Sequence, residues 1–363
     1  MVRGNRMVFI LSTLFFAILT VGLSGASAQL ASGDARLQEI IAAAKREGRL
    51  SLVYGDGSMN VSNGELVARF NKYYGLNVEV QYTSGPSAPN MVANIIQQTQ
   101  ARRPASTDVV LGYGNHMISL IDAGAIQKSD WENWASNIKI PGIVSTDGAA
   151  VALQSSTPGI AYNSDVLKGD DIPNSLQDFL LPKWKGRIAG TPYAASFDQV
   201  AFGLWGKEKT LDFGRKFAKQ IGGLIRCNEG DRLASGEFDV LALTCSQGNA
   251  LKPAARGAPI GFKLASDAPI VVLLYLAVPT NAVHPNAAKL WINFMLSPEA
   301  QKIQREQDFA DLHLLEGSMT AQVMADLQAK NVKFVVFDTE YYRKNPAVEV
   351  DEFLKEMQGI FRQ

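Results

Sequence analysis

The chain has 363 residues, of which 47% are hydrophobic and 19% are charged, so it can bury more than one hydrophobic core. Its 35 lysines and arginines balance its 35 aspartates and glutamates, and without Arg3 and Arg6 the net charge is near minus two. This balance argues against a nucleic-acid-binding protein, because such proteins need a concentrated basic surface.

The first 28 residues have the pattern of a secretory signal peptide. Arg3 and Arg6 precede an apolar stretch at 7–22, and small residues follow at 26–28. A membrane anchor is the alternative, but the apolar stretch is short for a membrane span and a cleavage pattern follows it directly. No cysteine stands directly after the cleavage pattern, so a lipid anchor is not indicated. We therefore predict secretion into the periplasm, with residues 29–363 as the mature protein.

The mature chain begins with the pattern of a β-α-β unit. The apolar run SLVYG stops at a glycine, and GELVARFNKYYG places apolar side chains at helical spacing before Gly75. Val78, Val80 and Tyr82 then alternate as in a half-buried strand. Such a unit implies parallel strands with a right-handed crossover.

The following segments continue the α/β pattern. MVANIIQQTQARRP and HMISLIDAGAI are typical of helices, and TDVVLGYG between them is typical of a short buried strand. The extended run ALQSSTPGIAYN suits a crossing into a second lobe. That lobe continues through helical and strand patterns to FDVLALTCSQ and the helix GNALKPAARG.

A second extended run, APIVVLLYLAVP, predicts a crossing back to the first lobe. It is followed by two helical segments, HPNAAKLWINFML and SPEAQKIQREQ, the latter with Ser297 as cap and Pro298 at the first helical position. We therefore expect two lobes without a linker between them. The predicted divisions are 29–155 (lobe 1), 156–268 (lobe 2), 269–325 (return to lobe 1) and 326–363 (a C-terminal helical segment packing across the lobes).

Cys227 and Cys245 are the only cysteines, and both lie in the mature chain. In an oxidising compartment they can form one disulfide closing a short loop, and two free buried thiols are the alternative. A metal site built on this pair would need further His or Cys ligands nearby, and the sequence has none. We predict neither a metal site nor a cofactor.

Residues for catalysis are scarce. The three histidines are His116, His284 and His313, and His284 precedes a proline at a helix start, which favours a surface or capping role. Cys245 and Ser246 are the candidate nucleophiles, but no G-x-S-x-G elbow surrounds them and no Walker loop or H-E-x-x-H motif occurs. A secreted hydrolase using Cys245 or Ser246 is therefore kept only as an alternative, and we predict no catalytic residue.

Several of these segments together resemble the solute-binding proteins of ABC importers. The segments are LSLVYGDGS, TDVVLGYG, GIAYNSDVL, LPKWKGRIAGTPYAASFDQ, LASGEFDVLAL, ARGAPIGF and HPNAAKLWINFMLSPEAQ, and the resemblance covers nearly all of 35–362. The group includes binders of ferric ion, thiamine, polyamines, phosphonates and sugar phosphates. The resemblance implies a type II periplasmic binding protein, an α/β fold whose two lobes have mixed central sheets flanked by helices, with a ligand cleft between them.

The resemblance also allows a test for iron. Ferric binders of this group have a histidine, a glutamate and a tyrosine pair at places that here hold Ser58, Tyr113, Ser246 and Gln247. Ferric iron prefers anionic oxygen ligands, which hydroxyl and amide groups supply poorly. The pair Tyr341-Tyr342 is too near the C-terminus to replace the missing tyrosines. Ferric iron held with a synergistic anion is therefore the alternative ligand.

The same four side chains suit an organic ligand, because each donates and accepts hydrogen bonds. An ordinary strand-to-helix turn, with Ser246 as a cap, is the alternative interpretation of TCSQ. Tyr54, Tyr113 and Tyr193 can offer aromatic faces to a carbon skeleton.

The loop TPYAASFDQ resembles the loop that holds an accessory anion in ferric binders. Small residues at its centre leave room for an anion at the amides of a helix start. The predicted ligand-binding residues here are Tyr193, Ala194, Ala195 and Ser196, and Arg232 is a candidate counter-charge or a solvated surface residue.

The predicted function is capture of a small organic anion, bearing a carboxylate or a phosphate, and its delivery to an inner-membrane ABC permease. We expect a monomer that performs no covalent chemistry.

Overall fold

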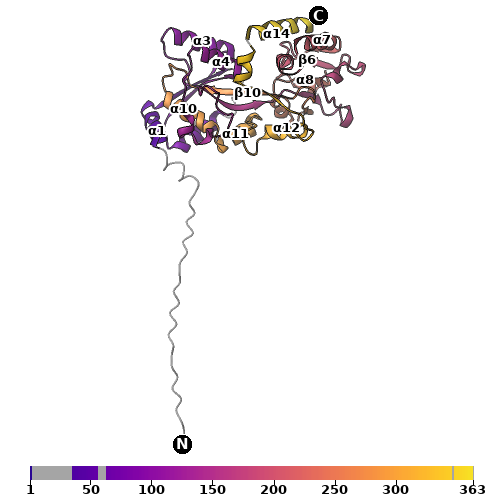
Figure 1. The fold of residues 1–363 in the computed structure, drawn as a ribbon. Coiled ribbons are helices and arrows are strands. Elements are labelled where there is room, and N and C mark those ends of the chain that lie inside the picture. The colour runs from indigo at the N-terminus through magenta and orange to yellow at the C-terminus, as the bar shows by residue number, and fades with distance from the viewer. Residues whose placement is uncertain (2–34, 56–62, 346, 363) are drawn as a thin grey trace.

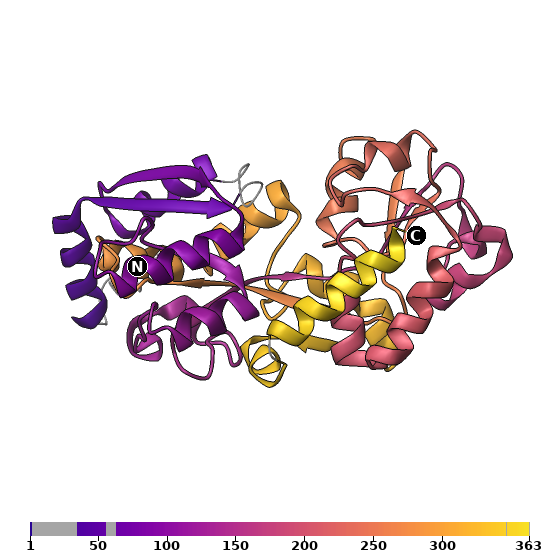
Figure 2. The same ribbon diagram turned by 90° about the horizontal axis from the view of Figure 1, so that it is seen from above.

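The computed structural model describes residues 1, 35–55, 63–345 and 347–362. Except for Met1, the predicted signal peptide lies outside the described residues, as does Ser58. None of the helices in the described part is long and apolar enough to cross a membrane. The described chain forms two lobes side by side, joined by extended strands and by the C-terminal segment (Figures 1 and 2).

Lobe 1 is built from the N-terminal α/β units and from helices that return later in the chain. In α1 the buried residues Leu37, Ile40 and Ala44 recur at helical spacing, and this face packs on α10. β1 and β2 pair in parallel, which confirms the predicted β-α-β unit. The elements are α1 (Ala35–Glu47), β1 (Arg49–Gly55), α2 (Asn63–Tyr74), β2 (Glu79–Gly85), α3 (Ala88–Gln100), β3 (Val110–Tyr113), α4 (Gly114–Asp122), α5 (Trp131–Trp134), α10 (Pro285–Met295), α11 (Pro298–Asp308) and α12 (Met319–Ala329).

Lobe 2 surrounds a five-stranded mixed sheet with the order β7-β6-β8-β5-β9. β6 pairs in parallel with β7 and β8, whereas β5 pairs antiparallel with β8 and β9. β8 is shorter than the predicted strand in FDVLALTCSQ, since the chain leaves the sheet before the cysteine. The elements are β5 (Ile160–Asn163), β6 (Ile188–Gly190), α6 (Phe197–Val200), α7 (Lys207–Ala218), β7 (Ile221–Leu224), α8 (Asp231–Ala234), β8 (Val240–Leu241), α9 (Gly248–Ala254) and β9 (Ile260–Lys263).

Two long strands connect the lobes, β4 (Ala150–Ser156) and β10 (Ile270–Ala277). They pair antiparallel over most of their length, and their residues are almost all buried. The other edge of β10 pairs with β3 of lobe 1 and, nearer lobe 2, with β11 (Val335–Phe337). The two predicted crossing segments are therefore neighbours in one sheet.

The C-terminal segment contacts both lobes through α13 (Thr339–Lys344) and α14 (Ala347–Phe361). α13 packs on α4, where a Cβ at Gly114 would lie 2.7 Å from Tyr342 Cδ2. α14 packs on α7, where Gly214 leaves room for the sulfur of Met357. In Figure 2 the yellow helix α14 runs from the junction onto lobe 2. The exact lobe boundaries stay a prediction.

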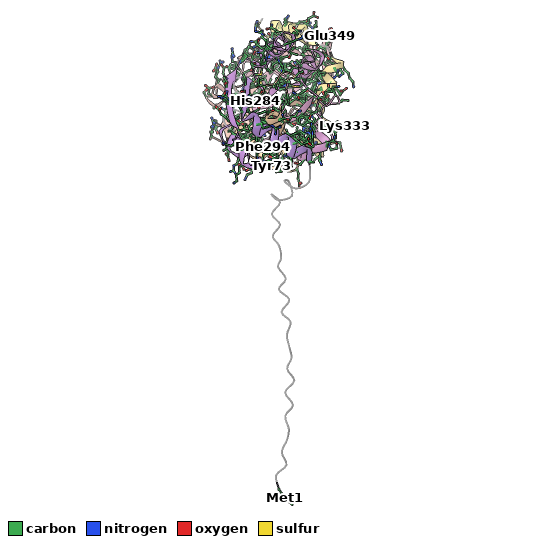
Figure 3. The ribbon with its side chains drawn as sticks, turned by 90° about the vertical axis from the view of Figure 1, so that its left-hand side faces the viewer. Met1, Tyr73, His284, Phe294, Lys333 and Glu349 are labelled. Carbon is green, nitrogen blue, oxygen red and sulfur yellow. A yellow bond between two sulfur atoms is a disulfide. The ribbon has the colours of Figure 1, made fainter. Side chains whose placement is uncertain are left out.

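Each lobe has its own core. The lobe 1 core contains Trp131, Trp134 and Trp291, and at its rim Tyr73 packs against Phe294 with ring centroids 5.5 Å apart (Figure 3). The lobe 2 core contains Trp184 together with phenylalanines from α6, α7 and α14. The predicted cap of α11 is confirmed, because Ser297 Oγ accepts from the amide of Ala300 at 3.2 Å.

Candidate functional site

A cleft lies where the two lobes meet the crossing strands. Its first part, which we call the tyrosine half, is a cavity of about 260 Å³ lined by Tyr113, Tyr193 and Tyr342 among others. Its second part, the lysine half, is also about 260 Å³ and is lined by Lys252, Ser246 and Asn249 among others. Tyr113 and Ser156 line both cavities, so the two halves are adjacent.

Tyr113 reaches the cleft from lobe 1 because it ends β3 and directly precedes α4. It is 40% exposed, which is high for a tyrosine at the end of a buried strand. Its backbone N–H donates to Nδ1 of His116 at 3.2 Å. Burial lowers the pKa of His116 to about 4, so this ring is neutral at pH 7. His116 therefore has a structural role, because it stabilises the turn from which Tyr113 extends into the cleft.

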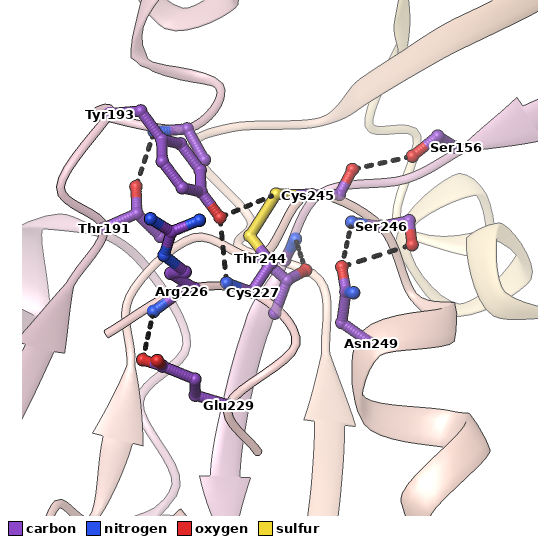
Figure 4. The surroundings of a disulfide bond; sticks show 12 residues. Ser156, Thr191, Tyr193, Arg226, Cys227, Glu229, Thr244, Cys245, Ser246 and Asn249 are labelled. Atoms are coloured by element: carbon purple, nitrogen blue, oxygen red, sulfur yellow. Dashed lines mark hydrogen bonds between the residues drawn. A yellow bond between two sulfur atoms is a disulfide. The ribbon is translucent and has the colours of Figure 1, made fainter. Parts of the chain in front are cut away.

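Tyr193 faces the cleft from lobe 2 and is held by the disulfide loop. The structure contains the Cys227–Cys245 disulfide, so the alternative of two free thiols is wrong. The Tyr193 hydroxyl accepts from the amide of Cys227 at 2.9 Å and lies 3.6 Å from Cys245 Sγ (Figure 4). Ser156 Oγ donates to the carbonyl of Cys245 at 2.8 Å. The disulfide thus joins the tyrosine loop to the end of β4.

The loop at 191–196 does not offer its amides to a ligand in the way predicted. Ala194 and Ser196 have left-handed φ angles of 50° and 64°. This conformation turns the Ala194 amide onto the Thr191 carbonyl at 3.1 Å, and the Ala195 amide onto Thr191 Oγ1 at 2.7 Å. Both amides therefore already have acceptors within the loop, which does not favour the predicted anion there, and the anion site stays a prediction.

The start of α6 holds a carboxylate of the protein itself. Asp198 accepts from its own backbone amide and from that of Gln199, and Gln199 Nε2 donates to Asp198 Oδ2 at 2.7 Å. Burial raises the pKa of Asp198 to about 7. Asp198 forms no ion pair with a lysine or arginine of the described residues.

Gln199 completes this corner of the cleft. Its Nε2 also lies 3.5 Å from the Tyr342 hydroxyl, whereas its Oε1 is buried without a hydrogen-bond partner. The amide nitrogen faces the ionised form of Asp198, because the opposite orientation would place two acceptors against each other. The tyrosine half therefore contains one carboxylate without a cation and one carbonyl oxygen without a donor.

Three predicted residues lie elsewhere or are engaged in the fold. Tyr54 is fully buried in lobe 1, where its hydroxyl accepts from Trp291 Nε1 at 3.0 Å, so its prediction as a ligand-facing ring was wrong. Gln247 borders the lysine half but is only 1% exposed, and all its hydrogen bonds go to the protein. Ala194 is buried and lines neither half of the cleft.

Other predicted residues do line the cleft. Tyr193, Ala195 and Ser196 border the tyrosine half, and Ser246 borders the lysine half. Arg232 lies outside both and pairs with Glu237 through Nε at 2.7 Å, which agrees with a solvated surface residue.

The sequence analysis missed Asp198, Gln199 and Tyr342. Asp198 and Gln199 stand in the quoted loop TPYAASFDQ, where an acid in the first turn of a helix is too common to signal a site. Tyr342 was judged too far along the chain, yet α13 places its ring in the cleft. Only the fold brings these three residues together.

The geometry gives the hydrolase alternative no catalytic pair. Cys245 is in the disulfide, and Ser246 Oγ bonds to Asn249 Oδ1 at 3.3 Å. Ser155 lies 2.6 Å from Nδ1 of His313, but this serine is 1% exposed and already accepts from the His313 amide. Among the described residues no cluster of three His, Cys, Asp or Glu side chains could hold a metal ion.

Asp198 predicts a pH dependence of the stability of the unliganded protein. Its pKa is about 7 in the folded state and about 4 in an unfolded chain, so its stabilising contribution is present below pH 4 and is lost as the pH rises to 7. Asp198→Asn removes this loss. From pH 5 to pH 8, the free energy of unfolding of the variant should rise by about 1–2 kcal/mol relative to that of the wild type. The difference is limited to this size because the cleft leaves part of the carboxyl hydrated.

Urea unfolding at both pH values measures this difference. The matched control is Asp170→Asn, an exposed aspartate of lobe 2 that should follow the wild type. An Asp198→Asn curve parallel to the wild type at all pH values would contradict the assigned protonation.

The chain belongs to a known family. The profile described as "Bacterial extracellular solute-binding protein" matches residues 106–345. Members of this family are binding proteins that work with ABC permeases. The predicted class and fold are therefore confirmed. No match was found among curated protein sequences.

Solved structures show the same fold at low sequence identity. The substrate-binding protein of an ABC transporter from Agrobacterium tumefaciens is 17% identical with a TM-score of 0.69, covering 88% of this chain and 97% of that one. Iron-bound HitA from Pseudomonas aeruginosa is 20% identical with a TM-score of 0.65, covering 86% and 99%. AfuA from Actinobacillus pleuropneumoniae, with fructose-6-phosphate bound, is 19% identical with a TM-score of 0.66, covering 87% and 99%.

Proposed function

We propose that this protein captures a small organic solute in the periplasm and delivers it to an inner-membrane ABC permease. The observation that carries the proposal is the pair Tyr113 and Tyr193. They come from different lobes, line one cavity, and are 40% and 37% exposed. Large aromatic side chains at the ends of buried elements are rarely left so open unless a partner covers them. A bound carbon skeleton would cover both rings as the lobes close.

Direct binding of ferric iron is supported less well. HitA is an iron-bound relative in fold, and here three tyrosines and Asp198 border the tyrosine half. Ferric iron binds tyrosine as the phenolate, however, and burial raises the pKa of Tyr342, which disfavours that form. An organic ligand needs only the neutral phenols.

An organic anion at residues 193–196 also receives little support. The amides of Ala194, Ala195 and Asp198 already have acceptors within the protein. Among the described residues that line the two halves, Lys252 in the lysine half is the only lysine or arginine, and its Nζ lies 3.5 Å from Asp308 Oδ1. The proposal is therefore an organic solute whose acidic groups, where it has any, are not held by that loop.

Thermal unfolding of residues 29–363 tests the proposal. The compounds are carboxylates, sugar phosphates, phosphonates, polyamines, thiamine and ferric citrate, together with a whole small-molecule extract of bacterial cells. A compound present at a hundredfold excess over its dissociation constant should add about 2.7 kcal/mol to the free energy of unfolding. Tyr113→Ala should weaken its binding at least about tenfold, because it removes most of one aromatic contact.

The control is Leu181→Ala, which shortens an exposed side chain of lobe 2 away from the cleft. It should bind as the wild type does. An unfolding temperature that neither the panel nor the extract raises would contradict a solute-binding function. A response to ferric salts alone would replace the organic solute by iron.

A further inference from the structure

We propose that the solute carries a protonated nitrogen, and that Asp198 and Gln199 select it in the tyrosine half of the cleft. This inference rests on the proposed function and adds the charge of the ligand. It reverses the charge expected from the sequence.

The charges around the cavity favour a cation. Asp198 and Asp351 line the tyrosine half, and the residues described there include no lysine, arginine or histidine. Asp198 is stabilised only by neutral amide donors, so its ionised form pays a desolvation cost that no counter-ion offsets. A protonated amine placed against this carboxylate would supply the missing counter-charge, whereas a phosphate or carboxylate would be repelled by it.

A second observation points to a hydrogen-bond donor. Gln199 Oε1 is buried without a partner beside Asp198, and its orientation is set by the amide nitrogen that faces the carboxylate. Buried carbonyl oxygens are nearly always paired, and an unpaired one costs about 1–3 kcal/mol. An ammonium group has several N–H donors and no acceptor, so it can bond to Asp198 and, once the Gln199 amide shifts to open Oε1 to the cavity, to Gln199 as well.

The tyrosines add a third contact of the same kind. Tyr113 and Tyr193 each have more than a third of their surface exposed and line the cavity, and Tyr342 borders it from α13. Aromatic faces attract ammonium groups, with a contribution of about 0.5–2 kcal/mol when water is excluded. Carboxylate, amide oxygen and aromatic rings thus favour the same chemical group. A neutral polyol would satisfy Gln199 but would leave Asp198 without a counter-charge.

Matched compounds test the charge directly. Putrescine, butanediol and succinate share one carbon chain, and the primary amine dimethylbutylamine is paired with its uncharged analogue dimethylbutanol. Isothermal titration calorimetry should show that at least one of the two cations binds tenfold or more tightly than its neutral partner. Succinate should bind more weakly than both putrescine and butanediol. Asp198→Asn should reduce this preference at least tenfold, while Asp170→Asn preserves it. Unfolding of unliganded Asp198→Asn confirms that the variant is folded.

The pH dependence of dimethylbutylamine binding is a second readout, because a primary amine stays protonated between pH 6 and pH 8. With a pKa of about 7 for Asp198, the affinity should fall about tenfold between pH 8 and pH 6 in the wild type and stay constant in Asp198→Asn. The other titratable groups around Asp198 are Tyr341 and Tyr342 on α13, Tyr113 at the start of α4, and Asp351 on α14. If putrescine is the cation that binds, the same comparison is made with it.

The outcomes separate this inference from the proposed function. If neutral partners bind as tightly as the cations, or if succinate or a sugar phosphate binds and neither cation does, the charge assignment is overturned and solute binding stands. If no compound of either panel binds and the cell extract has no effect, both fail.

Discussion

Replacing Cys227 and Cys245 by serine is expected to lower the free energy of unfolding by about 3 kcal/mol. The bond closes a loop with a sequence separation of 18 residues, and its removal gives the unfolded chain more conformational freedom. Urea unfolding followed by tryptophan fluorescence measures the loss. A reducing agent should destabilise the wild type to the level of the double variant and should leave that variant unchanged.

The same change should also weaken solute binding. The amide of Cys227 donates to the Tyr193 hydroxyl, and the carbonyl of Cys245 accepts from Ser156. Without the disulfide, the loop that holds Tyr193 can move away from the end of β4. Tyr193→Phe is the matched control, because it removes the hydrogen bond from the Cys227 amide but keeps the disulfide. Unfolding curves that coincide for the wild type and the double serine variant would contradict a stabilising disulfide.

Gln247→Ala is expected to cost about 2–4 kcal/mol, because it leaves several buried polar groups unpaired. Gln247 Oε1 accepts from the amide of Thr157 at 2.9 Å and from its hydroxyl at 3.1 Å. Nε2 donates to the Ser155 carbonyl at 3.3 Å and to Thr320 Oγ1 at 3.2 Å. One side chain thus connects the start of α9, the end of β4 and α12. Chemical unfolding of Gln247→Ala against the wild type gives the difference.

Ser246→Ala separates stability from ligand contact at the neighbouring position. Ser246 borders the lysine half and its hydroxyl bonds only within its own turn, so its replacement should cost less than about 1 kcal/mol. A larger loss of stability in Ser246→Ala than in Gln247→Ala would show that the roles of the two residues are reversed.

Much of the fold follows from local patterns in the sequence. The β-α-β unit at the start, the two crossing strands and the cap of α11 all depend on apolar spacing, glycine stops and a serine-proline pair. These signals act over a few residues, so a single sequence shows them. The placement of Tyr113 and Tyr193 beside a cleft followed in the same way, from strand ends in an α/β fold and from the resemblance to a family.

The charge preference that we propose for the site could not be predicted in this way. A small-residue loop before a helix indicates an anion site, but the left-handed conformation of Ala194 and Ser196 is a property of the folded loop. That conformation directs two amides inward, and Asp198 occupies others at the start of α6. A glutamine side chain makes the same hydrogen bonds whether it contacts a ligand in a cleft or connects segments of the protein core. Only its burial shows that Gln247 has the second role.

The sequence by itself determined the α/β architecture and the crossing segments, because these depend on periodic and local features, and its resemblance to a known family indicated the class of protein. Tertiary structure decided which side chains meet in the cleft. Tyr113, Asp198 and Tyr342 come from separate parts of the chain, and only the packing of α13 against α4 brings the last of them to the first two. The ionisation of Asp198 likewise depends on burial and on the absence of a neighbouring cation in the described part of the chain, which are properties of the folded cleft.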